Sequence, residues 1–251
     1  MDRHFVQIQV DNCVFYRYGC IILTYVDDLI IIGKSMAILD SVIDSLCDRD
    51  EDFELTYEGR NNKYIGVIIE DINNSSFEMS QRFLVRRIIS SLSLDENKTR
   101  GCNNQVGKPL LNCYLDGFQR NHKWIYWGSV GMLSYLSNTV RPEILMVVNQ
   151  TARYSMNPIL SHELDIMRIG QYMVDNTDSG IIYTIDKTKG VEIYVGANFS
   201  GGWDSADSSN TDNVLSRTGF LICYSGCPII WSSKLQTEIA LSTVEAEYIA
   251  M

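Results

Sequence analysis

The sequence lacks an apolar run long enough to cross a lipid bilayer, which takes about 20 predominantly apolar residues. The run "CIILTYV", for example, is followed directly by Asp27 and Asp28. The N-terminal stretch "MDRHFVQIQV" also lacks the basic start and the small-residue cleavage site of a secretory signal. We therefore expect a protein that is not secreted and has no membrane partner.

Cysteines in paired short spacings are also lacking. The chain has seven cysteines, an odd number, and they are scattered. Cys223 and Cys227 are the closest pair, and no second Cys or His pair stands nearby to complete a zinc site. This pattern favours reduced thiols, and so predicts a cytoplasmic or nuclear location.

An excess of positive charge is lacking as well. The chain has 21 Lys and Arg against 31 Asp and Glu, a formal net charge of −10, and the sequence pI is about 4.8. A strong phosphate-binding surface needs clustered excess Lys and Arg, so the composition argues against one. What the chain does have is 251 residues, 45% of them hydrophobic, which suffices for one large or two modest globular domains.

Strand and helix patterns alternate along the first third of the chain. Residues 5–33 predict strands at "FVQIQV", "CVFY", "CIILTYV" and "LIIIG", since they are dense in Val, Ile, Phe and Tyr. Apolar residues at helical spacing predict helices over 35–51 and 81–94. Between them "FELTY", "KYIGVIIE" and "SFEMS" predict short strands.

The remaining two thirds read as a loop, three helices and a second set of strands. The stretch 94–123 is polar and aperiodic, which predicts a connecting loop. Helices are predicted at 125–139, 142–156 and 161–175. From Gly180 strands are predicted at "IIYTI", "VEIYVGANF", "SRTGFLICY" and "CPIIWSS", and "TVEAEYIAM" begins a helix.

Two adjacent aspartates, Asp27 and Asp28, separate two apolar strands in "TYVDDLIIIG". By pattern they form a two-residue hairpin loop. Asp-containing turns are common, so the pair can be a simple turn between core strands. A carboxylate held at the end of two buried strands is equally a rigid support for a hard cation such as Mg²⁺. The motif "YVDD" alone leaves both interpretations open.

The surrounding text resembles the reverse transcriptase palm of copia-type LTR retrotransposons. "CVFYR" and "IILTYVDDLIIIG" carry the resemblance first. "KYIGVIIE" and "FEMSQRFLVRRII" are similar to the segments that follow in that family, and "VGKPL" to its short Pro-Leu linker. "WGSVGMLSYLSNTVRPEI" resembles the connecting region, and "SRTGFLICYSGCPIIWSSKLQTEIALSTVEAEYIA" the ribonuclease H segment of the same polyprotein.

The resemblance implies an α+β or α/β fold in three parts. A partial palm sheet with helices is expected over residues 1–94, and a connecting loop with a helical connection over 95–178. A partial ribonuclease H-like mixed sheet is expected over 179–251.

The resemblance also implies roles for the hairpin residues. In the family the two aspartates of Tyr-Val-Asp-Asp hold the catalytic Mg²⁺ ions, and here these are Asp27 and Asp28. Tyr25 and Val26 would shape the floor beneath the primer end. The third metal-binding aspartate of the family belongs to an earlier strand of the palm, upstream of this chain, so we expect Mg²⁺ binding to be weak or absent here.

The ribonuclease H-like part matches the family's carboxylates at one position. Gly196 stands where the first aspartate is expected, and Asn198 where another acid often stands. Glu247 matches the second carboxylate, as a vestigial catalytic residue, and the remaining two would lie beyond Met251. Asp204 and Asp207, in a polar insert, lie too far from a strand end to substitute.

These observations predict a fragment of a retrotransposon RNA-directed DNA polymerase that is inactive as this chain. Its ancestral partner would be an RNA or DNA template-primer. Two alternatives stay open: one piece of a split polymerase that a partner completes, or a non-enzymatic interaction module. Sheet edges exposed by the missing palm strands would allow self-association.

Overall fold

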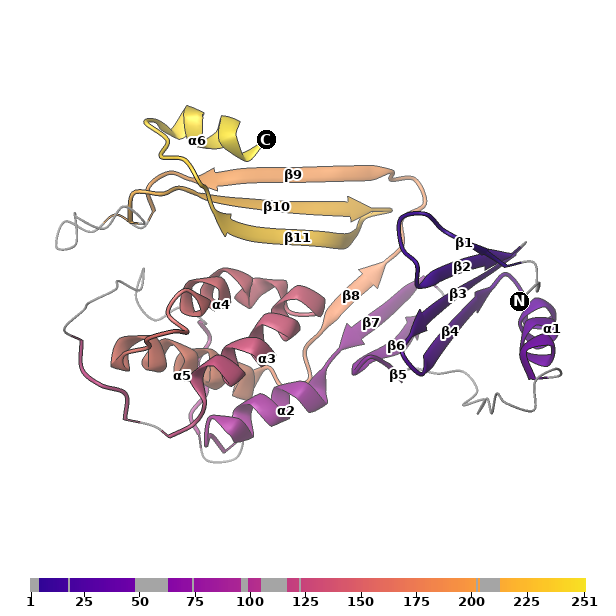
Figure 1. Cartoon of the computed structure of the whole chain (residues 1–251), viewed down its shortest axis with the longest axis horizontal. Coiled ribbons are helices and arrows are strands. Elements are labelled where there is room, and N and C mark those ends of the chain that lie inside the picture. The colour runs from indigo at the N-terminus through magenta and orange to yellow at the C-terminus, as the bar shows by residue number, and fades with distance from the viewer. Residues whose placement is uncertain are drawn as a thin grey trace. The chain divides into compact units, whose positions relative to one another are not determined.

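The structure is a computed structural model that describes residues 5–17, 19–47, 63–73, 75–95, 99–104, 117–121, 123–201, 203 and 213–251 (Figure 1). Helices and antiparallel sheets are both present, which confirms the mixed α+β class. The chain divides into two compact units, Met1–Ile65 and Gly66–Met251. The strand predicted at "FELTY" lies outside the described residues, and the three-part division stays a prediction.

The first unit contains an antiparallel sheet in the order β1-β2-β3-β4 and the helix α1 (Met36–Cys47). The strands are β1 (Val6–Gln7), β2 (Val14–Arg17), β3 (Cys20–Tyr25) and β4 (Asp28–Gly33). Successive strand residues face opposite sides of a sheet. Cys20 and Ile22 accordingly share one face and are buried with Val42 of α1, whereas Ile21 is 43% exposed. The small core of this unit therefore lies between its sheet and α1.

The strand predicted at "KYIGVIIE" is divided in the structure. β5 (Lys63–Tyr64) ends and β6 (Val67–Asn73) begins on either side of Ile65 and Gly66, whose φ angles are +49° and +76°. Extended strands require negative φ, so the chain cannot continue as one strand there. The glycine adopts this conformation at little cost.

The second unit contains two antiparallel sheets. In one, β6, β7 (Ser76–Ser80) and β8 (Ile181–Thr184) pair in that order, so strands about a hundred residues apart are neighbours. In the other the order is β11-β10-β9. Its strands are β9 (Val191–Asn198), β10 (Arg217–Tyr224) and β11 (Cys227–Leu235). The strands predicted after Gly180 are thus confirmed.

The helices of the second unit are α2 (Arg82–Ser91), α3 (Tyr126–Thr139), α4 (Leu145–Ala152), α5 (Leu160–Asp175) and α6 (Thr243–Ala250). The helix predicted at 142–156 is shorter than expected. A 3₁₀ turn, Pro142–Ile144, precedes α4. After Ala152 the N–H groups of Arg153 and Tyr154 donate to carbonyls three residues back, which tightens the chain and ends the α-helix.

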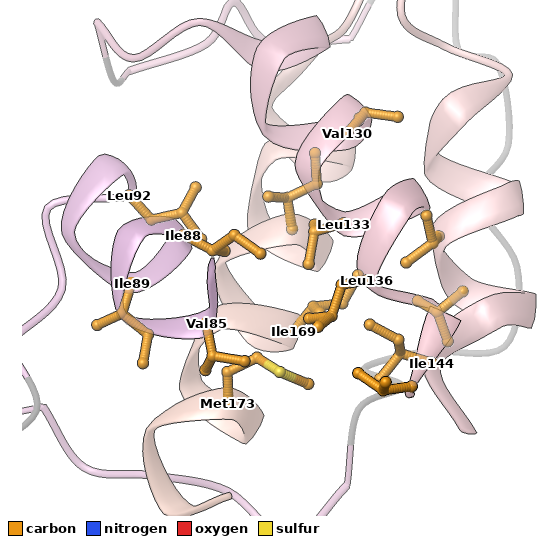
Figure 2. Close-up of a cluster of buried hydrophobic side chains, with 14 of the residues drawn as sticks. Val85, Ile88, Ile89, Leu92, Val130, Leu133, Leu136, Ile144, Ile169 and Met173 are labelled. Carbon is orange, nitrogen blue, oxygen red and sulfur yellow. The ribbon is translucent and has the colours of Figure 1, made fainter. Parts of the chain in front are cut away.

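The main core lies among α2, α3, α4 and α5 (Figure 2). Each helix contributes apolar residues at intervals of three or four, which align on one face. Fully buried members are Ile88, Leu92, Leu133, Leu136, Ile144, Val148, Ile166, Ile169 and Met173. Burial of these side chains provides the main driving force for folding this unit.

α5 begins with a side-chain cap. The Nδ1 atom of His162 accepts a hydrogen bond from the Ile159 N–H at 3.2 Å, and the imidazole stacks on Tyr154 with ring centroids 3.9 Å apart. His162 is 1% exposed. The histidine thus anchors the start of its helix, because it satisfies an N–H that the helix cannot pair internally.

Two hydrogen bonds fasten the β9–β11 sheet to the helices. The Trp231 Nε1–H donates to the Ser137 carbonyl at 2.9 Å, and Asn149 Nδ2 donates to the Ser233 carbonyl at 2.7 Å. The partners come from α3 and α4 on one side and β11 on the other. The helices and this sheet therefore pack as parts of one compact unit. Among the described residues, no helix combines the length and the apolar character that a bilayer crossing requires.

Asp165 of α5 should make stability depend on pH. Burial raises the pKa of Asp165 to about 6, and the nearby Arg168 opposes that rise. The ordinary value is 3.8. Between these values the folded chain holds a proton that the unfolded chain has released, so stability falls as pH rises through this window and is constant above it.

Asp165→Asn should therefore stabilise the chain at neutral pH by about 1–2 kcal/mol, a figure that allows for the solvent reaching this half-buried carboxylate. The gain should shrink toward zero as pH falls to about 4. Urea unfolding of both proteins across that range measures it. Asp175→Asn, an exposed change on the same helix, is the matched control. An equal gain at every pH would contradict the assignment.

Candidate active site

The aspartate pair lies at the end of the β3–β4 hairpin, but the turn differs from the predicted one. Tyr25 pairs with Asp28 in the strand register. The two loop residues are therefore Val26 and Asp27, and Asp28 is the first residue of β4. The prediction that Asp27 and Asp28 form the loop was wrong by one residue. The pairing of β3 with β4 includes Asp28, a residue that the pair of adjacent charges had placed in the loop.

Val26 has a φ angle of +53°, in the left-handed region. A β-branched side chain rarely adopts this conformation, because its Cβ substituents crowd the backbone. The side chain is 88% exposed, so no packing within the described residues compensates for the strain. The hairpin therefore holds a strained residue between Tyr25 and the aspartates.

Val26→Gly should stabilise the hairpin by roughly 1 kcal/mol, because glycine adopts positive φ without strain while its greater freedom in the unfolded chain offsets part of the gain. Amide hydrogen exchange at Tyr25 and Asp28 measures the local effect. Val26→Ala keeps a Cβ and should give a smaller gain. Faster exchange in the glycine variant than in the wild type would show that the valine is not strained.

Both aspartates are exposed, and neither side-chain carboxylate forms a hydrogen bond or ion pair with any described residue. Their oxygens are therefore open to other ligands. Mg²⁺ commonly keeps several waters and is bound through one or two carboxylates together with substrate phosphates. Asp27 and Asp28 fit that role by chemistry and by accessibility.

Tyr25 and Tyr64 lie near Asp28. Tyr25 is directly opposite Asp28, so the two side chains share a face of the sheet, and Tyr25 is 53% exposed. Burial raises the pKa of the Tyr64 phenol, and the neighbouring Asp28, Cys13 and Tyr25 raise it further. Sequence reasoning missed Tyr64, whose one available signal was its place at the start of "KYIG".

A third carboxylate does not join the pair within the described part of the chain. Over those residues, no group of three or more His, Cys, Asp or Glu side chains is placed to hold a metal ion. Over the same residues, the hairpin thus offers two exposed carboxylates.

The positions predicted from the ribonuclease H resemblance are on β9 and α6. Gly196 lies on β9, and a Cβ built there meets no atom within 4 Å. Glu247 is exposed on α6, and its carboxylate forms no hydrogen bond or ion pair with a described residue. α6 is held to the sheet by Gln236, whose Nε2 donates to the Ala246 carbonyl at 2.7 Å. Asn198 is exposed at the end of β9, and Asp204 and Asp207 lie outside the described residues.

Comparison with known proteins gives relatives among transposon polyproteins. The chain is 26% identical to the retrovirus-related Pol polyprotein from transposon TNT 1-94 of Nicotiana tabacum, in an alignment of 261 positions that covers 99% of the chain. It is 26% identical over 226 residues, 90% of its length, to the retrovirus-related Pol polyprotein from transposon RE1 of Arabidopsis thaliana. It is 25% identical over 232 residues to the putative transposon Ty5-1 protein YCL074W of Saccharomyces cerevisiae.

The matched part is a small share of the longer relatives. The chain spans 19% and 14% of the two plant polyproteins and 70% of the yeast protein. No protein-family model matches the chain. No solved structure matches it either. Over most of its length, the chain is similar to part of retrotransposon Pol polyproteins.

Proposed function

We propose that this chain is a segment of a retrotransposon RNA-directed DNA polymerase in which Asp27 and Asp28 are the metal-binding carboxylates. The observation that carries the proposal is the pair itself: two exposed carboxylates with no hydrogen-bond or ion-pair partner among the described residues, at the end of a hairpin between two core strands. Similarity to Pol polyproteins over nearly the whole chain supports the same origin.

In the proposed role, Asp27 and Asp28 hold Mg²⁺, and Tyr25 and Val26 contact the primer end. The bound metal would neutralise charge on the phosphate oxygens during nucleotidyl transfer. The hairpin supplies rigidity, because the paired strands behind the turn fix the backbone of both aspartates. RNA or DNA template-primer is the corresponding ancestral partner.

We further propose that the chain by itself does not catalyse polymerisation or RNA cleavage. In the ribonuclease H-like part, Gly196 occupies a strand position where a side chain has room, so packing does not require a glycine there. A glycine inside a strand weakens it. Loss of an ancestral aspartate accounts for Gly196 better than a structural demand does.

Primer extension on an RNA template with Mg²⁺ tests the proposal. We expect no extension by the wild-type chain or by Asp27→Asn/Asp28→Asn. Extension by the wild type that the double variant loses would support the metal role and overturn the inactivity. Binding of Mn²⁺ measured by electron paramagnetic resonance separates the two claims, since we expect weak binding, about millimolar, only in the wild type. Equal Mn²⁺ binding by both proteins would overturn the metal assignment.

The cytoplasmic or nuclear location and the self-association through sheet edges stay predictions. For the second, β4 is the last strand in the β1-β2-β3-β4 order of the first unit. Strand edges carry backbone N–H and C=O groups that another chain can pair with.

A further inference from the structure

Two arginines come together in the second unit where α4 meets the β9–β11 sheet. Arg217 is the first residue of β10, and its Nη1 donates to the carbonyl and the hydroxyl of Ser233, at 3.2 and 3.4 Å. The same Ser233 carbonyl accepts a hydrogen bond from Asn149 of α4 at 2.7 Å. Arg217 and Asn149 therefore converge on one atom.

Arg153 is brought to the same place by α4. It directly follows the helix and stands four residues after Asn149, a spacing that puts two side chains on one side of a helical turn. Its guanidinium lies over the Tyr154 ring at 5.5 Å and donates to Gln150 Oε1 at 3.2 Å. Burial and then the neighbouring Arg153 lower the pKa of Arg217, as expected for two like charges in proximity.

Arg217 has no carboxylate partner among the described residues, where its acceptors are the two oxygens of Ser233. A guanidinium carries five N–H donors, and the Nε and Nη2 groups of Arg217 are not among the enclosed polar atoms. Those donors are therefore open to a ligand. A half-buried cation beside a like charge is unfavourable unless an anion compensates for it.

We propose that Arg217 and Arg153 bind a phosphate group at the junction of α4 with β10 and β11. The planar guanidinium fork matches the paired oxygens of phosphate, and a phosphate has enough oxygens for two arginines at once. The phosphate comes from a nucleic-acid backbone or from a free phosphate, and both present the same oxygens. The proposal does not depend on Asp27 and Asp28 or on any polymerase activity.

A titration of the full chain with inorganic phosphate, at constant ionic strength, tests the site. We expect saturating phosphate to raise the wild-type Tm by about 5 °C, whereas chloride should not. Arg217→Gln and Arg153→Gln should each weaken phosphate binding at least tenfold. Arg86→Gln is the matched control, because Arg86 forms an exposed ion pair with Asp178 at 3.3 Å and should leave phosphate binding unchanged.

Two results would overturn the site. One is an equal phosphate effect in the wild type and in the Arg217→Gln and Arg153→Gln variants. The other is no phosphate effect in the wild type, which would mean that the two arginines are neighbours without a binding role. If Arg217→Gln fails to fold, ³¹P line broadening with Arg153→Gln and Arg217→Lys gives the same test, since lysine keeps the charge and loses the fork. A single-stranded oligonucleotide then identifies the source. Oligonucleotide binding that is lost in Arg217→Gln supports a phosphate of the nucleic-acid backbone. If inorganic phosphate binds but the oligonucleotide does not, the ligand is a free phosphate.

Discussion

Leu136→Ala should lower the free energy of unfolding by about 3–5 kcal/mol, because the truncation removes buried methyl groups and leaves a cavity in the centre of the helical core. Leu136 is fully buried on α3, among side chains from the other core helices (Figure 2). The surrounding residues come from several helices and cannot all move inward together. Urea unfolding followed by far-UV circular dichroism measures the loss.

The neighbouring residue provides the control. Tyr135 lies one position earlier on α3 and is 43% exposed. Tyr135→Ala has the same backbone context and should cost well under half as much, since less of its surface leaves water on folding. Equal losses in the two variants would show that α3 does not present Leu136 to the core.

Arg120→Met should destabilise the chain by about 3 kcal/mol, because it removes the Arg120 guanidinium from a buried carboxylate. Arg120 Nε donates to Glu163 at 3.0 Å, and Glu163 is fully buried. The same guanidinium donates to the Trp124 carbonyl at 2.8 Å and lies over the Trp124 ring at 4.6 Å. One side chain thus ties a loop residue to α5 and to the segment before α3.

Two further variants distinguish the buried charge from lost packing. Arg86→Met removes an exposed ion pair and should cost less than about 1 kcal/mol. Adding Glu163→Gln to Arg120→Met removes the buried negative charge as well and should restore a large part of the stability. If Arg120→Met costs no more than Arg86→Met, the buried pair is not important for stability. Thermal and urea unfolding at neutral pH provide the comparison.

Much of the fold follows from local patterns in the sequence. The helices predicted at 125–139 and 161–175 appear as Tyr126–Thr139 and Leu160–Asp175, because apolar periodicity reports which face a helix buries. The strands around the aspartates and those after Gly180 were predicted from short runs rich in β-branched and aromatic residues. The motifs at the hairpin and in the C-terminal part also resemble those of transposon Pol polyproteins, and the relatives support this resemblance.

Features that depend on backbone angles, or on residues distant in the sequence, could not be predicted from local patterns. The turn at Val26 and Asp27 depends on one residue in a left-handed conformation, which the residue type argues against. The arginine–glutamate pair joins residues 43 apart, and the Asn149–Ser233 bond joins residues 84 apart. Residues separated by such distances in the sequence share no periodic pattern that would predict their contact.

The sequence by itself determined the local elements and the aspartate pair, since alternation and helical spacing act between near neighbours along the chain. Only the tertiary structure decided that Asp28 belongs to a strand, that Gly196 faces open space, and that Arg153 lies near Arg217. The reason is physical: burial, charge proximity and free space are properties of segments brought together by folding, and residue order does not encode them locally.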